Sequence, residues 1–249
     1  NGVVTTWSHV REECRGIGHE FEVLHPACFR TFQAPRYPEI RLAVLPRFKI
    51  RRTLDAMQPE AIHIATEGPI GMAARGWCRN RGVPFTTSYH TQFPQYLKTY
   101  FHIPMGMTYG FCRWFHGKAE RTLVPTQSIK DELAAKDFDP DRIVVWTRGV
   151  RHELFHPYDD GDPLGDVPRP RFCYVGRVAA EKNIEAFLKL DLPGSMVVIG
   201  DGPARATLER RYPGVHFVGF HKGEDLARRI AACDVFVFPS VTDTYGVVM

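Results

Sequence analysis

Short apolar segments alternate with helical segments along almost the whole chain of 249 residues. Strands are expected at 61–65, 84–88 and 143–146, and the first and last of these are mostly apolar throughout, without the regular polar alternation of a strand that has one face in water. Strands of this kind are typical of a parallel sheet covered on both faces. The alternation therefore predicts an α/β protein with mostly parallel sheets and helices on both faces of each sheet.

A stretch rich in proline, glycine and aspartate interrupts the alternation at residues 157–169. It has no hydrophobic periodicity, which is typical of a linker. We therefore expect two Rossmann-like domains, 1–156 and 170–249, joined by this linker. The first domain begins with a helix and lacks a first strand, and the second stops just after a strand. We expect such a chain to be a fragment of a longer protein, because an incomplete sheet leaves an edge open.

Composition and charge exclude several classes of protein. Charged residues make up 24% and hydrophobic residues 44%, as in ordinary globular proteins, and no long apolar run predicts a membrane-spanning helix. The net charge is +6 over the first 150 residues and −2 over the rest, without a dense basic stripe. This pattern does not favour nucleic acid and fits an anionic small ligand or an acidic membrane surface. The six scattered cysteines indicate a reducing cytosol rather than a disulfide scaffold.

The main candidate site follows the expected strand at 171–175. Gly176 would let the backbone approach a ligand closely, and Arg177 and Lys182 precede a helix whose N-terminus offers free N–H groups. Such a combination can hold a diphosphate without a metal. A Gly-Asp-Gly-Pro turn at 200–203 would face the same crevice. Ordinary turns flanked by surface cations explain the same residues equally well at this point.

Other motifs point to other chemistry and are less well supported. A dinucleotide fingerprint is incomplete because Arg205 stands at the third glycine position, which disfavours a Rossmann dehydrogenase. Residues 152–156 match the zinc-protease pattern H-E-x-x-H, but Gly149 and Pro157 flank them closely and oppose the helix that this chemistry needs. The acidic residues at 137–141 fit a solvated loop. We therefore expect no metal site.

A third segment, the expected strand 235–238 with the Pro-Ser that follows it, adds a resemblance to a known family. Together with Asp243 and the Tyr-Gly-Val at 245–247, and with the motifs at 176–183 and 200–203, it makes the sequence resemble the retaining glycosyltransferases of family 4. These enzymes have the GT-B fold, in which two Rossmann-like domains face each other across a cleft. Asp243 stands where the family more often has glutamate, and the family's second acid would fall beyond Met249.

The first half resembles the same family less strongly. Gly2 matches the loop after the family's first strand, Glu67-Gly68 and His90 match segments that line its cleft, and Arg148 lies in its hinge segment. The subset that looks most similar includes mannosyltransferases and sulfoquinovosyl transferases.

The resemblance implies a reaction and a set of residues. A hexosyl group would move from a nucleotide-diphospho-sugar, such as GDP-mannose or a UDP-sugar, to a lipid or glycan acceptor, with retention and without a metal or other cofactor. The implied residues are catalytic His90, Arg177, Lys182 and Asp243; donor-binding Gly2, Gly176, Gly202, Phe220, Tyr245, Gly246 and Val247; and cleft residues Glu67, Gly68 and Arg148.

Two alternatives stay open: a nucleotide-sugar epimerase of the GT-B fold, and a non-catalytic module that binds a nucleotide-sugar. For each reading we expect a cytoplasmic protein, with peripheral contact to the anionic inner face of the membrane and no nucleic-acid partner. The aromatic-rich segment 100–116 is typical of a helix facing the core, and an amphipathic segment that touches lipid is the alternative.

Overall fold

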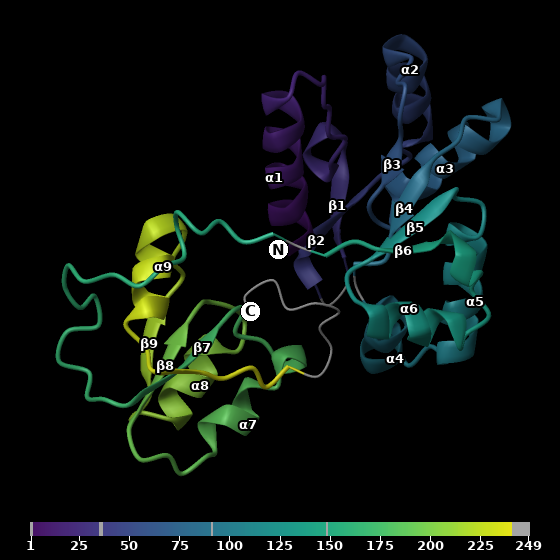
Figure 1. Ribbon diagram of the computed structural model, residues 1–249. Coiled ribbons are helices and arrows are strands. Elements are labelled where there is room, and N and C mark those ends of the chain that lie inside the picture. Colours follow the sequence, from purple (N-terminus) through teal and green to yellow (C-terminus); the bar gives the residue numbers. More distant parts are fainter. Residues whose placement is uncertain (1, 35–36, 91, 148, 241–249) are drawn as a thin grey trace. The chain divides into compact units, whose positions relative to one another are not determined.

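The computed structural model describes residues 2–34, 37–90, 92–147 and 149–240. The chain divides into two compact units, Asn1–Arg148 (unit 1) and Gly149–Met249 (unit 2). Each unit contains its own four-stranded parallel sheet with helices packed against it (Figure 1). The predicted α/β class with parallel sheets is thereby confirmed.

The sheet of unit 1 has the strand order β3-β4-β5-β6, which follows the chain. In its register His63 pairs with Thr86 and Ile64 pairs with Thr87. Because successive side chains of a strand point to opposite faces, His63, Thr86 and Ser88 share one face of the sheet, and Ile64 and Thr87 share the other. The strands are β3 (His63–Ile64), β4 (Thr86–Ser88), β5 (Arg121–Val124) and β6 (Ile143–Val145).

Helices of unit 1 pack around two apolar clusters. One cluster joins α2 and α3 to Ile64 and Phe85, and the other joins α5 and α6 to Val124 and Ile143. Local sequence explains the ends of α3, since proline opens it and Gly82 closes it in the left-handed conformation. The helices are α1 (Gly2–Gly16), α2 (Arg47–Met57), α3 (Pro69–Arg81), α4 (Phe93–Phe101), α5 (Met105–His116) and α6 (Gln127–Ala134), with 3-10 turns η1 (Pro26–Cys28) and η2 (Pro140–Arg142).

A separate antiparallel hairpin, β1 (Thr31–Ala34) and β2 (Tyr37–Ala43), lies outside this sheet. The sequence shows two apolar pieces, around 31–32 and 42–45, but does not predict that these regions pair with each other. The sequence also predicts a strand at 21–24, and this prediction is wrong, because these residues have no strand geometry. Their side chains still pack: Phe21 stacks with Trp7 and Leu24 lies against the core.

Unit 2 is built on the strand order β10-β7-β8-β9. Helices α7 and α8 pack on one face of this sheet around Tyr174 and Val198, and α9 packs on the other around Val197 and Ile199. The elements are β7 (Arg171–Val175), η3 (Ala180–Lys182), α7 (Ile184–Leu188), β8 (Ser195–Ile199), α8 (Arg205–Arg211), β9 (His216–Gly219), α9 (Gly223–Ala231) and β10 (Val235–Phe236).

The segment 157–169, expected to be a linker, packs within unit 2. Leu164 is buried against the cluster that contains Val197. The guanidinium of Arg171 is almost fully buried and donates to both carboxylate oxygens of Asp162, at 2.8 and 2.6 Å. A buried charge is costly unless it is paired and hydrogen-bonded, so Arg171 holds this segment in place. The two compact units divide after residue 148, and the expected domains 1–156 and 170–249 with a linker between them stay a prediction.

The aromatic segment 100–116 forms the end of α4 and all of α5. Helix α5 buries Tyr109, Cys112, Phe115 and His116, which fits the interpretation as a core helix. The ring of Trp114 is partly exposed but stacks on the guanidinium of Arg75, 3.9 Å from the ring centroid. Within the part of the chain that the structure describes, no helix has the length and apolar character needed to cross a bilayer.

Candidate functional site

The loops that follow β7 and β8 interlock through their backbones. The amide of Gly176 donates to the carbonyl of Ile199 (3.0 Å), the amide of Val178 to that of Asp201 (2.9 Å), and the amide of Ala204 back to that of Val178 (3.1 Å). Because β7 and β8 are parallel neighbours, both loops leave the sheet at its carboxyl edge. The two turns singled out in the sequence therefore lie together.

Glycines make this close contact possible. A Cβ atom on Gly200 would lie 1.8 Å from the carbonyl oxygen of Gly176, and one on Gly202 would lie 2.3 Å from that of Val178. Such distances are far inside van der Waals contact, so no side chain fits at either position. Gly176 has φ +150°, and a Cβ there would meet the hydroxyl of Tyr174 at 2.9 Å. The packing of the two loops thus requires these glycines before any ligand is considered.

Both predicted phosphate-binding cations lie in the loop between β7 and α7. A guanidinium nitrogen of Arg177 is 3.4 Å from the carboxylate of Glu181. About a third of the Arg177 side chain is exposed, whereas the Glu181 side chain is nearly buried. Arg177 therefore reaches solvent while its guanidinium stays paired with the Glu181 carboxylate. Lys182 ends the short turn η3, and Asn183 follows in the left-handed conformation. That the two cations bind one phosphate group stays a prediction.

The order of the strands makes the edge at β7 a topological switch point. From β7 the chain proceeds to β8 and β9 on one side and later returns to β10 on the other. In open α/β sheets, ligands bind outside the carboxyl ends of strands at such a point. The side-chain amide of Asn183 donates to the carbonyl of Pro239 (3.2 Å), which joins the loop after β7 to the segment after β10. Beside it, the buried hydroxyl of Ser240 has no hydrogen-bond partner among the described residues.

Phe220 follows β9 at the same carboxyl edge. Its side chain is 66% exposed, and the ammonium of Lys222 lies 5.9 Å from its ring centroid. Gly219 before it has φ +88°, and the guanidinium of Arg205 lies at 3.2 Å from the place of its missing Cβ. Phe220 is thus available to a ligand at this edge, though β8 separates its strand from β7. Its role in donor binding stays a prediction.

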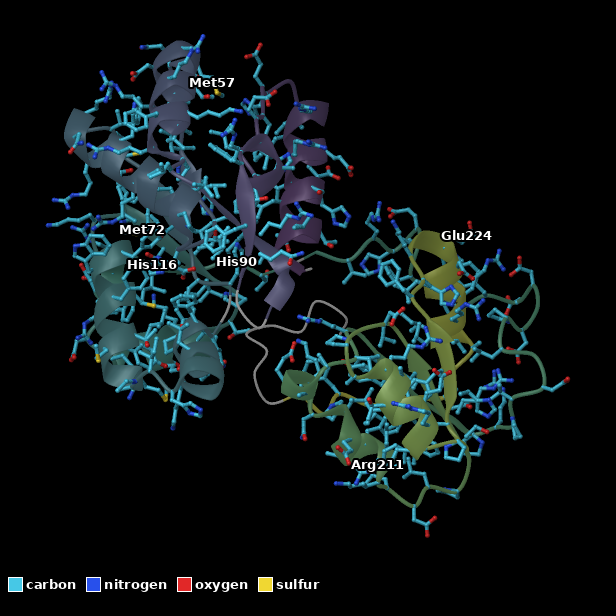
Figure 2. All side chains as sticks on the ribbon, turned by 180° about the vertical axis from the view of Figure 1, so that it is seen from behind. Met57, Met72, His90, His116, Arg211 and Glu224 are labelled. Atoms are coloured by element: carbon cyan, nitrogen blue, oxygen red, sulfur yellow. The ribbon has the colours of Figure 1, made fainter. Side chains whose placement is uncertain are left out.

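In unit 1, His90 follows β4 and contacts helix α1. The indole N–H of Trp7 donates to Nε2 of His90 at 3.1 Å. The Trp7 ring also lies 4.3 Å from the ring of His63 and 5.6 Å from that of Trp146, measured between centroids. Trp146 comes directly after β6, so it lies at the same carboxyl edge as His90. His90 and His116 are labelled in Figure 2, which shows His116 near the end of α5.

His63 is held between two hydroxyl groups on its face of the sheet. Its Nδ1 lies 2.8 Å from Oγ1 of Thr86, and its Nε2 lies 2.8 Å from Oγ of Ser88. Burial, with a smaller contribution from His90, lowers the pKa of His63 to about 3. His63 is therefore neutral at physiological pH, and its uncharged ring packs against the ring of Trp7.

Glu67, a predicted cleft residue, ends a buried polar chain on the other face of the sheet. Its carboxylate is 3.2 Å from Nε2 of His116, whose Nδ1 lies 2.9 Å from Oγ1 of Thr87. Thr87 in turn contacts the hydroxyl of Thr122 at 3.0 Å. The side chains of Glu67 and His116 are 9% and 1% exposed. This burial makes Glu67 an anchor for the loop after β3 and leaves little of it for a ligand.

Gly68, its neighbour, caps α3 in an extended conformation, and a Cβ there would make only ordinary contacts. Gly71 is different, since a Cβ on it would lie 1.9 Å from the carbonyl oxygen of Thr66. The close approach of α3 to the loop after β3 therefore depends on Gly71, a residue that the sequence analysis does not single out.

The structure does not assign a role to the remaining predicted site residues. Gly2 is the first residue of α1. The others lie outside the described residues, and their roles stay predictions: Arg148, Asp243, Tyr245, Gly246 and Val247.

Neither acidic nor histidine motif forms a metal centre in the described ranges. There, no group of three or more His, Cys, Asp or Glu side chains could hold a metal ion. The H-E-x-x-H segment at 152–156 forms turns instead of a helix. In the acidic loop, Asp139 caps the turn η2 by accepting from the amide of Asp141 at 3.1 Å.

Sequence reasoning misses the residues that support His90. Trp7 lies in a polar stretch of α1, and its only signal is that a large aromatic ring stands among threonine, serine and histidine. His63 and His116 look like isolated histidines, because their partners are distant in the chain. Gly200 is visible in the Gly-Asp-Gly-Pro turn, but its contact with Gly176 depends on strand register.

Comparison with known proteins finds two matching family profiles. Residues 1–154 match Glycosyltransferase Family 4, and residues 169–249 match Glycosyl transferases group 1. Together they cover both units.

Individual proteins show the same relationship. A sulfoquinovosyl transferase of Arabidopsis thaliana is 30% identical over 94% of this chain and 48% of its own length. A GDP-mannose-dependent alpha-mannosyltransferase of Mycobacterium tuberculosis is 29% identical over 98% of this chain and 71% of its own. The chain thus spans about half of the first relative and less than three quarters of the second.

Among solved structures, HepE of Anabaena in complex with UDP has a TM-score of 0.62 at 15% identity, covering 81% of this chain and 58% of that one. At this identity the likeness concerns the fold alone, and it confirms the predicted GT-B type of architecture.

Proposed function

Since the chain belongs to glycosyltransferase family 4, we propose that the protein transfers a hexosyl group from a nucleotide-diphospho-sugar to a lipid or glycan acceptor, with retention of configuration and without a metal. One observation carries this proposal: the interlocked glycine loops after β7 and β8 lie at a topological switch point, next to Arg177 and Lys182. Backbone amides and cations at such an edge are suited to a diphosphate.

The names of the similar proteins support two donor classes. The mycobacterial relative is GDP-mannose-dependent, and HepE is in complex with UDP. We therefore propose GDP-mannose or a UDP-sugar as the donor. The exposed ring of Phe220 is the side chain that we assign to the region of the base.

In the proposed reaction the bond between the anomeric carbon and the β-phosphate oxygen breaks, and the leaving nucleoside diphosphate takes the electron pair. The acceptor hydroxyl forms the new bond on the same face of the sugar and gives its proton to the leaving phosphate oxygen. Negative charge grows on the diphosphate as the bond breaks, so Arg177 and Lys182 stabilise the transition state more than the ground state. Their positive charge takes the place of a metal.

Other residues keep the roles that the family resemblance implies, as part of this proposal. His90 contacts the transferred sugar, and Asp243 binds its hydroxyl groups. The backbone at Gly2, Gly176, Gly202, Tyr245, Gly246 and Val247 contacts the donor.

We further propose that the protein is cytoplasmic and contacts the anionic inner face of the membrane through α2. The side chains of Leu45 and Phe48 are both 78% exposed, beside the exposed cations Arg47, Arg51 and Arg52. Exposed apolar groups flanked by cations suit an anionic lipid surface, since burial and charge attraction act together. Such contact would bring the protein to a lipid acceptor.

The membrane contact is tested by co-sedimentation with vesicles of phosphatidylglycerol and phosphatidylcholine. Phe48→Ser with Arg52→Gln should reduce the bound fraction several-fold, whereas Met107→Ser with Arg113→Gln on α5 should leave it unchanged. Equal binding by the first variant and the unchanged protein would refute the contact.

The reaction is tested by incubating the protein with GDP-mannose, UDP-glucose or UDP-sulfoquinovose and a lipid extract. Release of nucleoside diphosphate together with a new glycoside is the expected result. A free sugar epimer would indicate the epimerase alternative, and nucleotide binding without turnover would indicate a binding module.

A further inference from the structure

The guanidinium of Arg205 joins the loop after β8 to the end of β9. Its Nη2 donates to the carbonyl of Phe217 on β9 at 3.3 Å. Its Nη1 lies 3.5 Å from the carboxylate of Asp201 in the loop after β8. The backbone that carries the side chain is fixed as well, since the amide of Arg205 donates to the carbonyl of Gly202 at 3.1 Å. Arg205 therefore reaches from one strand end to the next along the carboxyl edge of the sheet.

The same guanidinium packs against Gly219, where β9 ends. Gly219 has φ +88°, a left-handed conformation that turns the chain just before Phe220. The Nη1 atom of Arg205 lies 3.2 Å from the place of the missing Cβ of Gly219. Arg205 thus supports the turn that sets the direction of Phe220, whose side chain is largely exposed.

Two carboxylates beside Arg205 make it unsuited to bind a diphosphate directly. In addition to Asp201, a carboxylate oxygen of Glu209 lies 3.7 Å from Nε of Arg205, one turn further along α8. Two negative charges offset the single positive charge of the guanidinium and would repel a diphosphate. We therefore expect Arg205 to act through the backbone that it holds.

Arg205 is also the residue that stands at the third glycine position of the incomplete dinucleotide fingerprint. In that fingerprint, the third glycine allows close packing of the helix on the strand. Here the position carries a long side chain that contacts β9 instead. A glycine there could not connect the loop after β8 with the turn at Gly219.

We propose that Arg205 is a positioning residue for the nucleoside part of the donor, because it holds the turn at Gly219 and thereby keeps the ring of Phe220 in place for the base. This inference rests on the proposed function, which assigns Phe220 to the region of the base and the loops after β7 and β8 to the diphosphate. Those loops are held together by their own backbone hydrogen bonds. Loss of the guanidinium should therefore weaken the binding of a nucleoside diphosphate and leave the binding of inorganic pyrophosphate unchanged.

Calorimetric titration with GDP, UDP and inorganic pyrophosphate tests this role. In Arg205→Gln, the Kd for the nucleotide that the unchanged protein binds more tightly should rise about tenfold, and the Kd for pyrophosphate should change less than about twofold. Arg210→Gln makes the same change at an exposed position of α8 and should alter neither constant.

A double-mutant cycle with Phe220→Ala shows whether Arg205 acts through this ring. Phe220→Ala should itself raise the Kd for the nucleotide and leave that for pyrophosphate unchanged. Adding Arg205→Gln to it should raise the nucleotide Kd by less than a further factor of about two. Without any nucleotide, amide exchange in a peptide covering 216–222 should be faster in Arg205→Gln than in Arg210→Gln, with exchange at 200–204 unchanged.

The outcomes separate this inference from the proposed function. Equal weakening of nucleotide and pyrophosphate in Arg205→Gln, unchanged nucleotide binding, or losses that multiply with Phe220→Ala would each overturn the inference while the protein still binds its donor. If the unchanged protein bound none of the three probes, the proposed function would fail. Faster exchange at 216–222 in Arg205→Gln would then still support the contact between Arg205 and the turn at Gly219.

Discussion

The carbonyl oxygen of Gly176 occupies the space of a side chain at Gly200, only 1.8 Å from where a Cβ would stand. Two strand ends that are distant in the sequence are thereby locked into one surface. The contact is made by backbone atoms, and Arg177 remains partly exposed beside it.

Gly200→Ala should break this contact. The added methyl group must push the loop after β7 away, and we expect a loss of about 3 kcal/mol in the free energy of unfolding of unit 2. Gly214→Ala is the matched control, because nothing lies within 4 Å of its Cβ position. Urea denaturation of both variants checks this, and equal stability of the two would contradict the described packing.

Stability of unit 1 should depend on pH through His63. Its pKa is about 3 in the folded protein against 6.5 as the ordinary value. Below pH 6.5 the unfolded state therefore binds a proton that the folded state does not, so stability falls as pH falls, by roughly 1.4 kcal/mol per pH unit down to about pH 3. His63→Gln should lose about 2 kcal/mol less than the unchanged protein between pH 7 and pH 5.

Tryptophan fluorescence reports on this unit specifically, because all four tryptophans, at positions 7, 77, 114 and 146, lie in it. If His63→Gln showed the same loss of stability between pH 7 and pH 5 as the unchanged protein, His63 would not be the group responsible.

Arg75 should stabilise the end of α5. Its buried guanidinium donates to the carbonyls of Trp114 (2.6 Å) and Phe115 (2.9 Å). Replacement by methionine fills similar space but leaves both carbonyls without a donor, which should cost about 3 kcal/mol. Arg79→Met, an exposed position on the same helix α3, should change stability by less than about 0.5 kcal/mol. Thermal unfolding of the two variants side by side provides the comparison.

Much of the architecture follows from local sequence, and the exceptions have physical causes. The strands expected at 171–175 and 195–199 are confirmed. Both segments are largely apolar and of strand length, and most of their side chains are buried in the sheet. The strand expected at 21–24 is absent because strand geometry requires a partner. Residues 157–169 look like a linker, yet Asp162 holds them in unit 2, because its carboxylate pairs with the buried guanidinium of Arg171, nine residues further along the chain.

The candidate site is predictable to a similar degree. The glycines and cations of residues 176–183 are visible because they are consecutive. The support of His90 by Trp7 joins positions 83 residues apart, and only the packing of α1 on the sheet brings them together.

Cation removal should weaken donor binding without unfolding the protein. Lys182→Gln and Arg177→Gln should each raise the Kd for the nucleoside diphosphate at least tenfold, because each removes one charge-assisted contact. Arg210→Gln removes the same charge from an exposed position on α8 and should not change Kd. Calorimetric titration gives these constants, and unchanged affinity in both site variants would exclude their phosphate role.

The central claim is that a nucleoside diphosphate binds at the carboxyl edge of the unit 2 sheet. Amide hydrogen exchange, measured by mass spectrometry with and without GDP or UDP, tests it most directly. We predict slower exchange in peptides that contain 176–183 and 200–204, with exchange in α8 unchanged. Slower exchange confined to unit 1, or none in either loop at saturating nucleotide, would contradict the account.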